Sequence, residues 1–283
     1  LTLYSDGSRY NTLIGARAGA AGTTGFNLNT VVGTFALDRC TTNASSNVAI
    51  GYAAMHGDFG ANDVSGGTDI NVPQWKIPVW NVFKENWVNP GYGGGVKNPG
   101  CWYSFSIGNV DFLMTDGRYY RDFKKEKTML GAVQKNWLLN SLKASKATFK
   151  VIASETLWTE HADKGGADSW WGVREEREEI FSVIDQEKIG GVILISADRH
   201  RTDVYKIHRP KGYTIYEFET SKLTNNHTHN TKKEALFSYN KGNFFGSLSF
   251  NLNLEDPQVT FRCITINGKE VYALPLKRSA LER

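Results

Sequence analysis

The sequence has few cysteines, little surplus charge and no long apolar run. Its three cysteines, Cys40, Cys101 and Cys263, lie far apart and show no metal-ligand spacing, so they allow at most one disulfide. The formal net charge is only +4 and no run of five like charges occurs, which argues against a nucleic-acid-binding protein. No segment is apolar enough to cross a bilayer. A content of 40% hydrophobic and 22% charged residues is typical of a folded protein, and a small acidic substrate is compatible with it.

Residues 1–55 are rich in Gly, Ala, Thr and Asn and contain a repeat. The segments Asn11–Gly15, Asn29–Gly33 and Asn47–Gly51 start 18 residues apart. One alanine keeps the same phase in each copy, at Ala18, Ala36 and Ala54. Self-similarity at a fixed period predicts a stacked, β-solenoid-like unit, in which each copy supplies a short strand and a turn at Gly. Such a coil cannot bury its own apolar face, so several copies or a partner chain are needed.

The repeat pattern N-T-x-x-G-x-x-A resembles the head repeats of trimeric autotransporter adhesins and of some phage tail fibres. This resemblance covers residues 11–55 and implies an extracellular β-roll that forms a homotrimer. A flexible Gly/Ala/Thr-rich leader is the alternative. We favour the repeat, because a flexible leader has no reason to keep phase.

From residue 56 onward the composition changes, and all eight Trp lie in this part. Period-two and apolar segments predict strands at Trp102–Ile107, Val110–Met114, Phe149–Ala153, Gly191–Ser196, Thr214–Glu219, Gly246–Leu254, Val259–Ile266 and Lys269–Pro275. Helical periodicity predicts helices over Gln134–Ala144 and Glu175–Glu187, whereas Pro and Gly predict a loop from Trp75 to Pro99. The sequence therefore predicts a layered α/β fold with a β-rich closing segment, in which both helices cover one face of a buried sheet.

The sharpest motif is Ser196-Ala197-Asp198-Arg199-His200, directly after the apolar segment Val192–Ile195. Ligand-binding side chains collect at the C-terminal ends of buried strands in α/β folds. A carboxylate and an imidazole two residues apart can face one ion such as Zn, Fe or Mn, and the carboxylate also suits Ca. A surface loop in which Arg199 pairs with Asp198 is equally compatible with this motif alone.

Further motifs follow one another in an order that resembles the PhoD-type alkaline phosphatases. They are D-x-R-x-x-R at Asp116–Arg121, MLG-x-x-Q-x-x-WL at Met129–Leu138, D-x-W-x-G at Asp168–Gly172 with Glu176-Arg177, S-A-D-R-H at Ser196–His200, and Tyr216–Ser221. The resemblance covers about residues 56–283. It implies a metallophosphoesterase-like sandwich with a dinuclear metal centre, a phosphate-ester substrate and a secreted, extracellular or periplasmic location.

The same resemblance assigns roles to four residues of these motifs. Asp198 and His200 are carried over as metal ligands, for Fe, Ca, Zn or Mn. Arg118 is placed on the phosphate oxygens and assigned a catalytic role, and Arg121 is assigned to substrate binding, since a planar guanidinium suits phosphate. Structural ion pairs of the two arginines with Asp116 or Asp122 are about as compatible with the sequence.

One family motif, W-D-D-H-D followed by F-G-x-N-D, is only partly present. Its tail is intact at Asp58–Asp63, so Asp58 and Asn62 are further expected metal ligands. His56 stands where the family has a metal-binding Asp, and Gly57 stands where it has the His that protonates the leaving group. Gly57 can supply no proton. His56 is therefore the candidate catalytic substitute.

The family's G-D-x-x-Y metal motif does not occur in residues 1–55, which offer only Asp6, Asp38 and Cys40 as ligands. The chain also begins at Leu1 rather than Met, as expected of a processed or trimmed chain. We expect at most one weakly held ion and impaired phosphoesterase activity. The competing hypothesis is a non-enzymatic trimeric adhesin or fibre protein whose phosphatase-like region is inactive.

The other histidines receive weaker expectations. His227 and His229 read as part of a solvated polar loop rather than as ligands. His161 follows Ser154 in a segment that borders the active-site cleft in the family. His208 reads as a surface residue beside Arg209 and Pro210.

Overall fold

The computed structural model describes residues 76–162, 168–224 and 226–283 in full, together with the backbone of four short N-terminal strands. These strands are β1 (Leu3–Asp6), β2 (Asn11–Ile14), β3 (Thr30–Val32) and β4 (Val48–Ile50).

The chain divides into two compact units. One comprises Leu1–Gly66 and Trp75–Trp87, and the other comprises Gly67–Gln74 and Val88–Arg283. Each unit has its own sheet structure, and we describe them separately. The sequence-based boundary at residues 55 and 56 stays a prediction.

In the first unit, β2, β3 and β4 pair in parallel, and β1 pairs antiparallel with β2. Thr12 lies opposite Thr30, which lies opposite Val48. This register matches the 18-residue period of the sequence repeat. The alanine column and the turns between these strands lie outside the described residues, so the β-solenoid and the homotrimer stay predictions.

The predicted loop from Trp75 to Pro99 is wrong over much of its length, because helix α1 spans Lys76–Asn86. Pro78 lies in the first turn of this helix. The first turn lacks internal partners for its backbone N–H groups, so a proline there costs no hydrogen bond. Lys84 then packs its ammonium group 3.6 Å from the ring of Trp80. A proline thus marks the start of a helix here rather than a break.

The second unit is built on a seven-stranded sheet with the order β11-β9-β10-β8-β7-β6-β5. The strands are β5 (Tyr103–Ile107), β6 (Val110–Met114), β7 (Phe149–Ala153), β8 (Val192–Ser196), β9 (Thr202–Ile207), β10 (Ile215–Thr220) and β11 (Phe237–Tyr239). β6, β7, β8 and β10 run parallel to one another, whereas β5, β9 and β11 are antiparallel additions. Four consecutive parallel strands therefore form the centre of the sheet.

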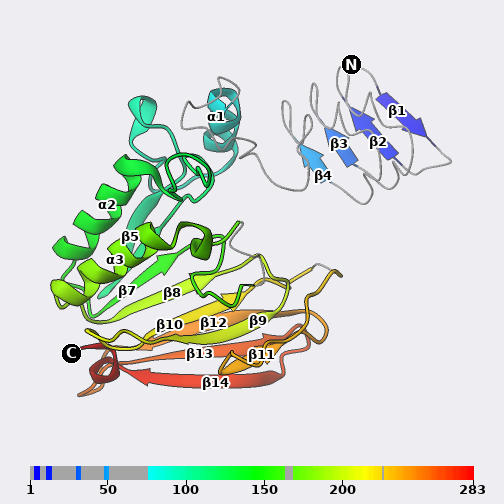
Figure 1. Ribbon diagram of the computed structural model, residues 1–283. Helices are drawn as coiled ribbons and strands as arrows, with labels where there is room; N and C mark the ends of the chain where they lie inside the picture. The colour runs from blue at the N-terminus through cyan, green and yellow to red at the C-terminus, as the bar shows by residue number, and fades with distance from the viewer. Residues whose placement is uncertain are drawn as a thin grey trace. The chain divides into compact units, whose positions relative to one another are not determined.

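Helices α2 (Gly131–Ala144) and α3 (Arg174–Gln186) lie along one face of this sheet (Figure 1). α2 connects β6 to β7 and α3 connects β7 to β8, and both steps add a strand in the same direction. Right-handed crossovers in one direction place their helices on the same face. This confirms the predicted placement of both helices on one face of the buried sheet. Short 3-10 helices lie at Gly95–Lys97, Trp170–Val173 and Arg278–Leu281.

A three-stranded antiparallel sheet packs against the other face of the large sheet. It consists of β12 (Phe244–Asn251), β13 (Gln258–Thr265) and β14 (Glu270–Lys277). Phe218 of β10 stacks on Phe261 of β13 at 4.5 Å between ring centroids, and Phe149 of β7 packs against Phe250 of β12 at 5.5 Å. Every residue of β7 is buried as a result, which is the covering on both faces that an apolar strand indicates.

β9 and β11 are absent from the predicted set of strands. β9 carries Asp203, which looks unsuited to a buried strand. Its carboxylate accepts a 2.6 Å hydrogen bond from Arg201, and both side chains are fully buried. A buried charge is acceptable where it is paired in this way. β9 therefore lacks an apolar strand pattern in the sequence, because one of its buried residues is a charged partner of Arg201.

Candidate active site

The loops that follow β6, β7, β8 and β10 leave the large sheet at the same edge, because these four strands are parallel. Neighbouring strands lie about 4.8 Å apart, so the ends of β6 and β8 lie about 10 Å apart. This carboxyl edge carries the predicted D-x-R-x-x-R and S-A-D-R-H motifs. It is the candidate active site.

The loop after β6 is organised by the carboxylate of Asp116. One carboxylate oxygen accepts backbone hydrogen bonds of 2.9 Å from Arg118 and Tyr119, and the other accepts one of 2.8 Å from Cys101. The side chain of Gln134 in α2 binds both backbone groups of Asp116 at 2.7 Å. Asp116 therefore shapes the turn, and its carboxylate hydrogen-bonds to backbone rather than to an arginine.

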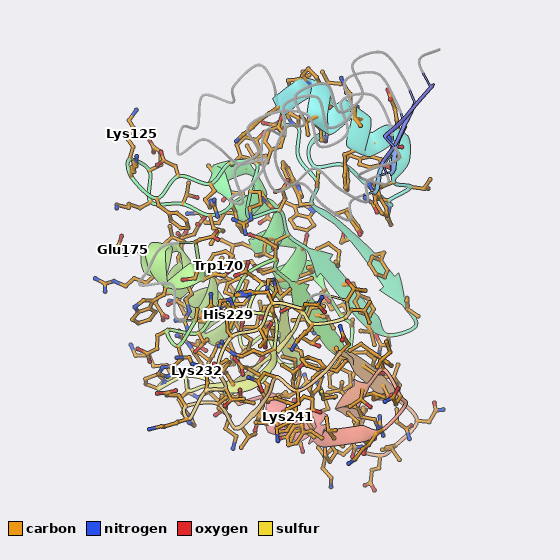
Figure 2. All side chains as sticks on the ribbon, turned by 90° about the vertical axis from the view of Figure 1, so that its right-hand side faces the viewer. Lys125, Trp170, Glu175, His229, Lys232 and Lys241 are labelled. Carbon is orange, nitrogen blue, oxygen red and sulfur yellow. The ribbon has the colours of Figure 1, made fainter. Side chains whose placement is uncertain are left out.

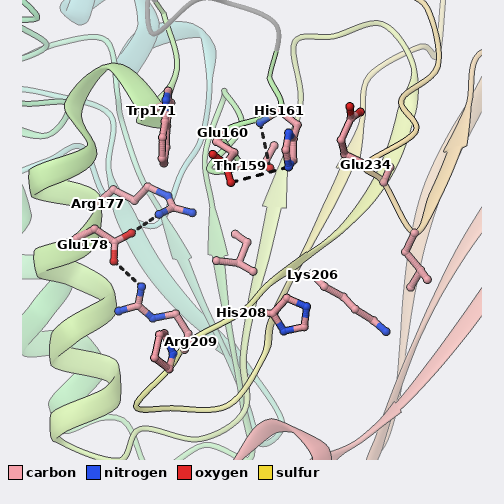
Figure 3. Close-up of a pocket in the computed structure, with 14 residues that line it drawn as sticks. Thr159, Glu160, His161, Trp171, Arg177, Glu178, Lys206, His208, Arg209 and Glu234 are labelled. Atoms are coloured by element: carbon pink, nitrogen blue, oxygen red, sulfur yellow. Dashed lines mark hydrogen bonds and ion pairs between the residues drawn. The ribbon is translucent and has the colours of Figure 1, made fainter.

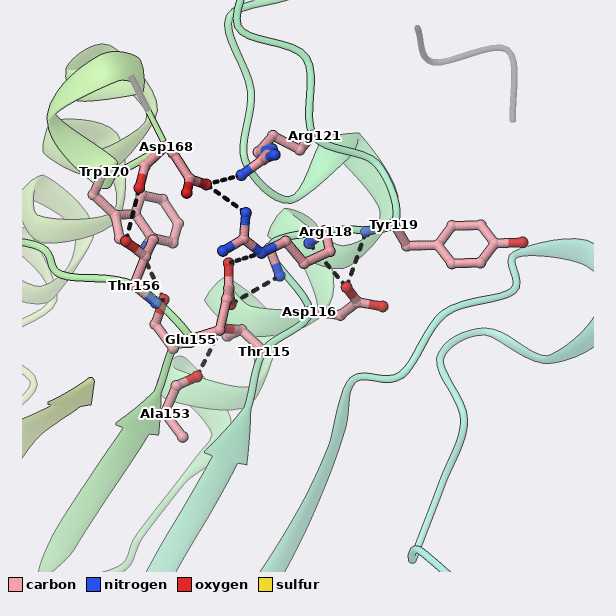
Figure 4. Close-up of polar contacts among 12 residues, drawn as sticks. Thr115, Asp116, Arg118, Tyr119, Arg121, Ala153, Glu155, Thr156, Asp168 and Trp170 are labelled. Carbon is pink, nitrogen blue, oxygen red and sulfur yellow. Dashed lines mark hydrogen bonds and ion pairs between the residues drawn. The ribbon is translucent and has the colours of Figure 1, made fainter. Parts of the chain in front are cut away.

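The guanidinium groups of Arg118 and Arg121 converge on one carboxylate oxygen of Asp168 (Figure 4). Arg118 also lies 3.8 Å from a carboxylate oxygen of Glu155, whose other oxygen accepts the backbone N–H of Gly117 at 3.2 Å. Burial raises the pKa of the Glu155 carboxyl. Two cationic groups from one loop thus share a single anionic position.

The alternative expectation paired Arg118 and Arg121 with Asp116 or Asp122, whereas their ion-pair partner is Asp168. Asp122 is buried and its carboxylate accepts backbone hydrogen bonds from Lys124, Lys125 and Glu126, at 2.8, 2.9 and 3.3 Å. Asp168 is about fifty positions away along the chain. Its proximity follows from the fold and not from local spacing.

Asp168 is held in place by the loop after β7. Its carbonyl oxygen accepts a 2.9 Å hydrogen bond from the hydroxyl of Thr156, and its backbone φ is 49°. The rings of Trp158 and Trp170 stack at 3.8 Å, and the indole N–H of Trp170 donates to Ser154 at 2.9 Å. The anionic partner of the two arginines is therefore held by Thr156 and lies two residues before the stacked Trp170.

The S-A-D-R-H loop has an unusual backbone. Asp198 has φ 87° and His200 has φ 49°, a left-handed conformation that is uncommon for residues other than glycine and that clusters at functional sites. The backbone N–H of His200 donates to the hydroxyl of Ser221 at 2.8 Å, and this hydroxyl donates to Glu219. The loop after β10 thus holds His200 in its strained position.

His200 lies beside two other histidines. The ring nitrogens of His200, His227 and His229 all lie within 4.8 Å of one another. Ring centroids are 5.1 Å apart for His200 and His227, 5.8 Å for His200 and His229, and 4.7 Å for His227 and His229. Asp198, the predicted partner of His200, is not among the donors of this group. Among the described residues, this is the one set of three His, Cys or acidic side chains with such convergence.

His227 and His229 lie in a polar and largely exposed loop, as expected, and the structure adds their position beside His200. His227 is exposed and His229 is half-buried, and in Figure 2 His229 lies below Trp170 and above Lys232. Partial burial lowers the pKa of His229 to about 4, and the nearby cations of Arg199 and Arg201 act in the same direction. The imidazole of His229 is therefore neutral near pH 7. Sequence reasoning gave this pair little weight because its position beside His200 depends on the fold.

Glu217 of β10 connects the loop after β7 to the end of β8. Its carboxylate accepts hydrogen bonds from the backbone N–H groups of Trp158 at 2.8 Å and Thr159 at 3.0 Å, and from the hydroxyl of Ser196 at 2.6 Å. Complete burial raises the pKa of Glu217 to about 7, against the opposing effect of these three donors. The segment Tyr216–Ser221 thus has a structural role beneath the site.

The remaining predicted residues have other outcomes. His56, Asp58 and Asn62 lie outside the described residues. His208 is exposed, as predicted. His161 lines a separate pocket of about 650 Å³ together with His208 (Figure 3).

The fold and the edge that carries these loops define a mixed α/β protein with a candidate ligand site at the carboxyl ends of parallel strands. Residues 91–260, more than half of the chain, match the family model of the PhoD-like phosphatases. The chain therefore belongs to the PhoD-like phosphatase family.

Two known proteins are similar to this chain. Alkaline phosphatase D of Bacillus subtilis (strain 168) is 26% identical over 126 residues, which cover 37% of this chain and 22% of that protein. A solved structure described as the structure of PhoD superposes with a TM-score of 0.52 at 18% identity, over 71% of this chain and 45% of that one. The chain thus matches less than half the length of either relative. The solved structure supports the α/β fold, and the adhesin resemblance of the repeats stays a prediction.

Proposed function

We propose that this chain is a metal-dependent phosphoesterase of the alkaline phosphatase or phosphodiesterase type, acting on small phosphate esters. The observation that carries the proposal is the convergence of Arg118 and Arg121 on one anionic oxygen, at the same strand edge as His200. Paired guanidinium groups suit phosphate oxygens as well as a carboxylate. Family membership supports the same reaction class.

The metal ligands in this proposal are Asp198, His200, Asp58 and Asn62. The first two share the loop after β8, and carboxylate, amide and imidazole donors suit Fe, Ca, Zn or Mn. A bound ion would lower the pKa of a bound water and neutralise charge on the phosphoryl group. Arg118 and Arg121 would then orient the ester through its non-bridging oxygens, in place of the carboxylate of Asp168.

We further propose that turnover is slow, because Gly57 offers no proton to the leaving group and His56 is offset by one residue. General acid catalysis typically contributes about 100- to 10,000-fold to a rate. The variant Gly57→His is therefore expected to raise kcat, whereas Gly57→Ala is not. A Gly57→His variant no faster than Gly57→Ala would remove this explanation of slow turnover.

The test of the proposed function is hydrolysis of p-nitrophenyl phosphate and bis(p-nitrophenyl) phosphate by the full chain. The chain is stripped of metal with a chelator and then assayed with each candidate ion in turn. We expect activity that returns with metal and that is lost in Arg118→Gln. Hydrolysis that persists unchanged in the stripped chain would contradict a metal-dependent reaction.

The parallel, in-register pairing of β2, β3 and β4 favours a second candidate, a non-enzymatic trimeric surface or fibre protein. Its test is the mass of the full chain in solution by light scattering, with a trimer supporting it and a monomer opposing it. Either candidate fits an extracellular or periplasmic location, which stays a proposal. No helix in the described part of the chain is long and apolar enough to span a membrane.

A further inference from the structure

The three imidazoles at the carboxyl edge come from two separate loops that the structure ties together. His200 follows β8, and His227 and His229 follow β10. The hydroxyl of Thr228, which lies between the latter two, donates a 2.9 Å hydrogen bond to the carbonyl of His200. The hydrogen bond from the Thr228 side chain to the His200 backbone therefore holds the two loops, and their histidines, side by side.

The second loop is also fixed from its other side. The side-chain amide of Asn240 donates to the carbonyl of His229 at 3.0 Å, and the ammonium of Lys222 donates to the carbonyl of Asn240 at 2.9 Å. Lys222 is itself buried. His229 is thus held by a residue that follows β11, and the loop is positioned even though His227 is exposed.

The spacing of the nitrogens suits a metal ion. Metal–nitrogen bonds of about 2.0–2.1 Å in a tetrahedral site place ligand nitrogens about 3.4 Å apart. The three histidines have ring nitrogens within 4.8 Å of one another, so small rotations of the exposed and half-buried rings close the site. Imidazole ligands without a carboxylate favour a borderline transition ion such as Zn²⁺ over the oxygen-preferring Ca²⁺.

We propose that His200, His227 and His229 bind one divalent transition ion through three imidazoles, with the fourth coordination position open to a water or a phosphate oxygen. His227 and His229 are ligands that the family motifs do not supply. The role of the open position in hydrolysis rests on the proposed function, but binding of the ion does not. The cation of Arg199 acts on His229 and would attract a phosphate to this position, whereas the charge of buried Arg201 is paired with Asp203.

The test measures metal binding directly. The full chain is stripped with a chelator, and binding of Zn²⁺ and of Ca²⁺ is followed by calorimetry and elemental analysis. Co²⁺ substitution reports the ligand geometry through its visible spectrum. We expect one Zn²⁺ per chain, bound at least about 100-fold more weakly in His227→Ala/His229→Ala, since loss of an outer contact alone can cost 10- to 100-fold.

The matched control is the double variant His161→Ala/His208→Ala, because these two histidines line the separate pocket and lie outside the cluster. It should bind Zn²⁺ as the unaltered chain does. Unfolding curves show whether His227→Ala/His229→Ala still folds, and His227→Asn/His229→Asn provides a second, polar replacement. Zn²⁺ affinity and Co²⁺ spectra unchanged in both folded variants would overturn the proposal.

The two proposals fail in different ways. If Zn²⁺ binding depends on the three histidines but no phosphate ester is hydrolysed, the proposed function is wrong and the proposed metal site is supported. If metal-dependent hydrolysis and Zn²⁺ binding are both unaffected in His227→Ala/His229→Ala, the proposed metal site is wrong and the proposed function is supported.

Discussion

The loop after β6 and the loops after β8 and β10 lie at the same edge of the sheet. Their functional side chains have different partners. Arg118 and Arg121 already contact an anion of the protein's own, the carboxylate of Asp168. The three histidines contact one another with no acidic group in their cluster. An incoming phosphate must therefore displace Asp168 from the arginines, whereas a metal ion at the histidine cluster would displace no carboxylate of that cluster among the described residues. The difference suggests that metal binding precedes phosphate binding at this edge.

The largest effect is expected for His200→Ala, which removes the one residue shared by the family motif and the imidazole cluster. We expect loss of metal binding and of activity, by at least about 100-fold in each. His208→Ala is the control, since it is exposed and lines the other pocket. Elemental analysis and phosphate-ester hydrolysis check both quantities. Full metal content in His200→Ala would place the ion elsewhere.

The second effect concerns the arginine side of the comparison. Arg118→Gln keeps hydrogen-bonding capacity but removes a positive charge, so we expect kcat/KM to fall by about 100- to 1,000-fold while metal binding is unchanged. Arg262→Gln, which alters an ion pair with Glu270 on the small sheet, should leave kcat/KM unchanged. Equal losses in metal content and in activity would instead show that Arg118 supports the metal site.

A third prediction concerns Glu217, whose carboxylate connects the loop after β7 to the end of β8. Glu217→Gln places an amide N–H against a backbone N–H, and we expect a loss of about 1–3 kcal/mol in unfolding free energy at pH 7. The folded pKa of about 7 exceeds the ordinary 4.5, so the folded state retains this proton longer than the unfolded state. The contribution of Glu217 to stability therefore falls as pH rises from 4.5 to about 7.

Urea unfolding between about pH 4 and pH 8 checks this dependence. The variant should lack the decline that Glu217 causes in the unaltered chain, so the stability difference between the two narrows as pH rises. Asp256→Asn is the control, because hydrogen bonds from the backbone N–H and hydroxyl of Ser279 lower the pKa of the Asp256 carboxyl, so this group stays charged through most of the range. Parallel pH profiles for Glu217→Gln and the unaltered chain would show that Glu217 does not titrate in this range.

The smallest effect tests the competition at the arginines. Asp168→Asn removes the competing charge, and Asn tolerates the left-handed backbone of this position. The backbone contact to Thr156 is kept. We expect inorganic phosphate to inhibit about 5- to 10-fold more strongly, a change of about 1 kcal/mol. Weaker inhibition by phosphate would mean that Asp168 mainly positions the two arginines.

Sequence patterns were most informative where a local signal and the fold agreed. The apolar run Val192–Ile195 predicted β8, and the Asp198–His200 motif predicted a loop directly after it, because both signals lie within ten consecutive residues. The apolar faces of α2 and α3 predicted their helices to within a few residues. The α1 helix was missed because Pro78 was interpreted as a loop signal, although it lies in the first turn.

The candidate site was only partly predictable, since its contacts join distant segments. Asp168 contacts Arg118 and Arg121 through the return of the chain after β7. Likewise, His227 and His229 look like an ordinary polar loop until β10 places them beside His200. Local patterns identify residue types that suit a reaction, whereas these partners are set by strand order and loop packing.

The most direct test of metal-dependent hydrolysis at this edge is the rate of p-nitrophenyl phosphate hydrolysis by the full chain before and after metal removal. Our account predicts that chelation abolishes turnover, that a divalent ion restores it in the unaltered chain, and that the same ion fails to restore it in His200→Ala. Turnover that survives chelation and is equal in His200→Ala would contradict the account.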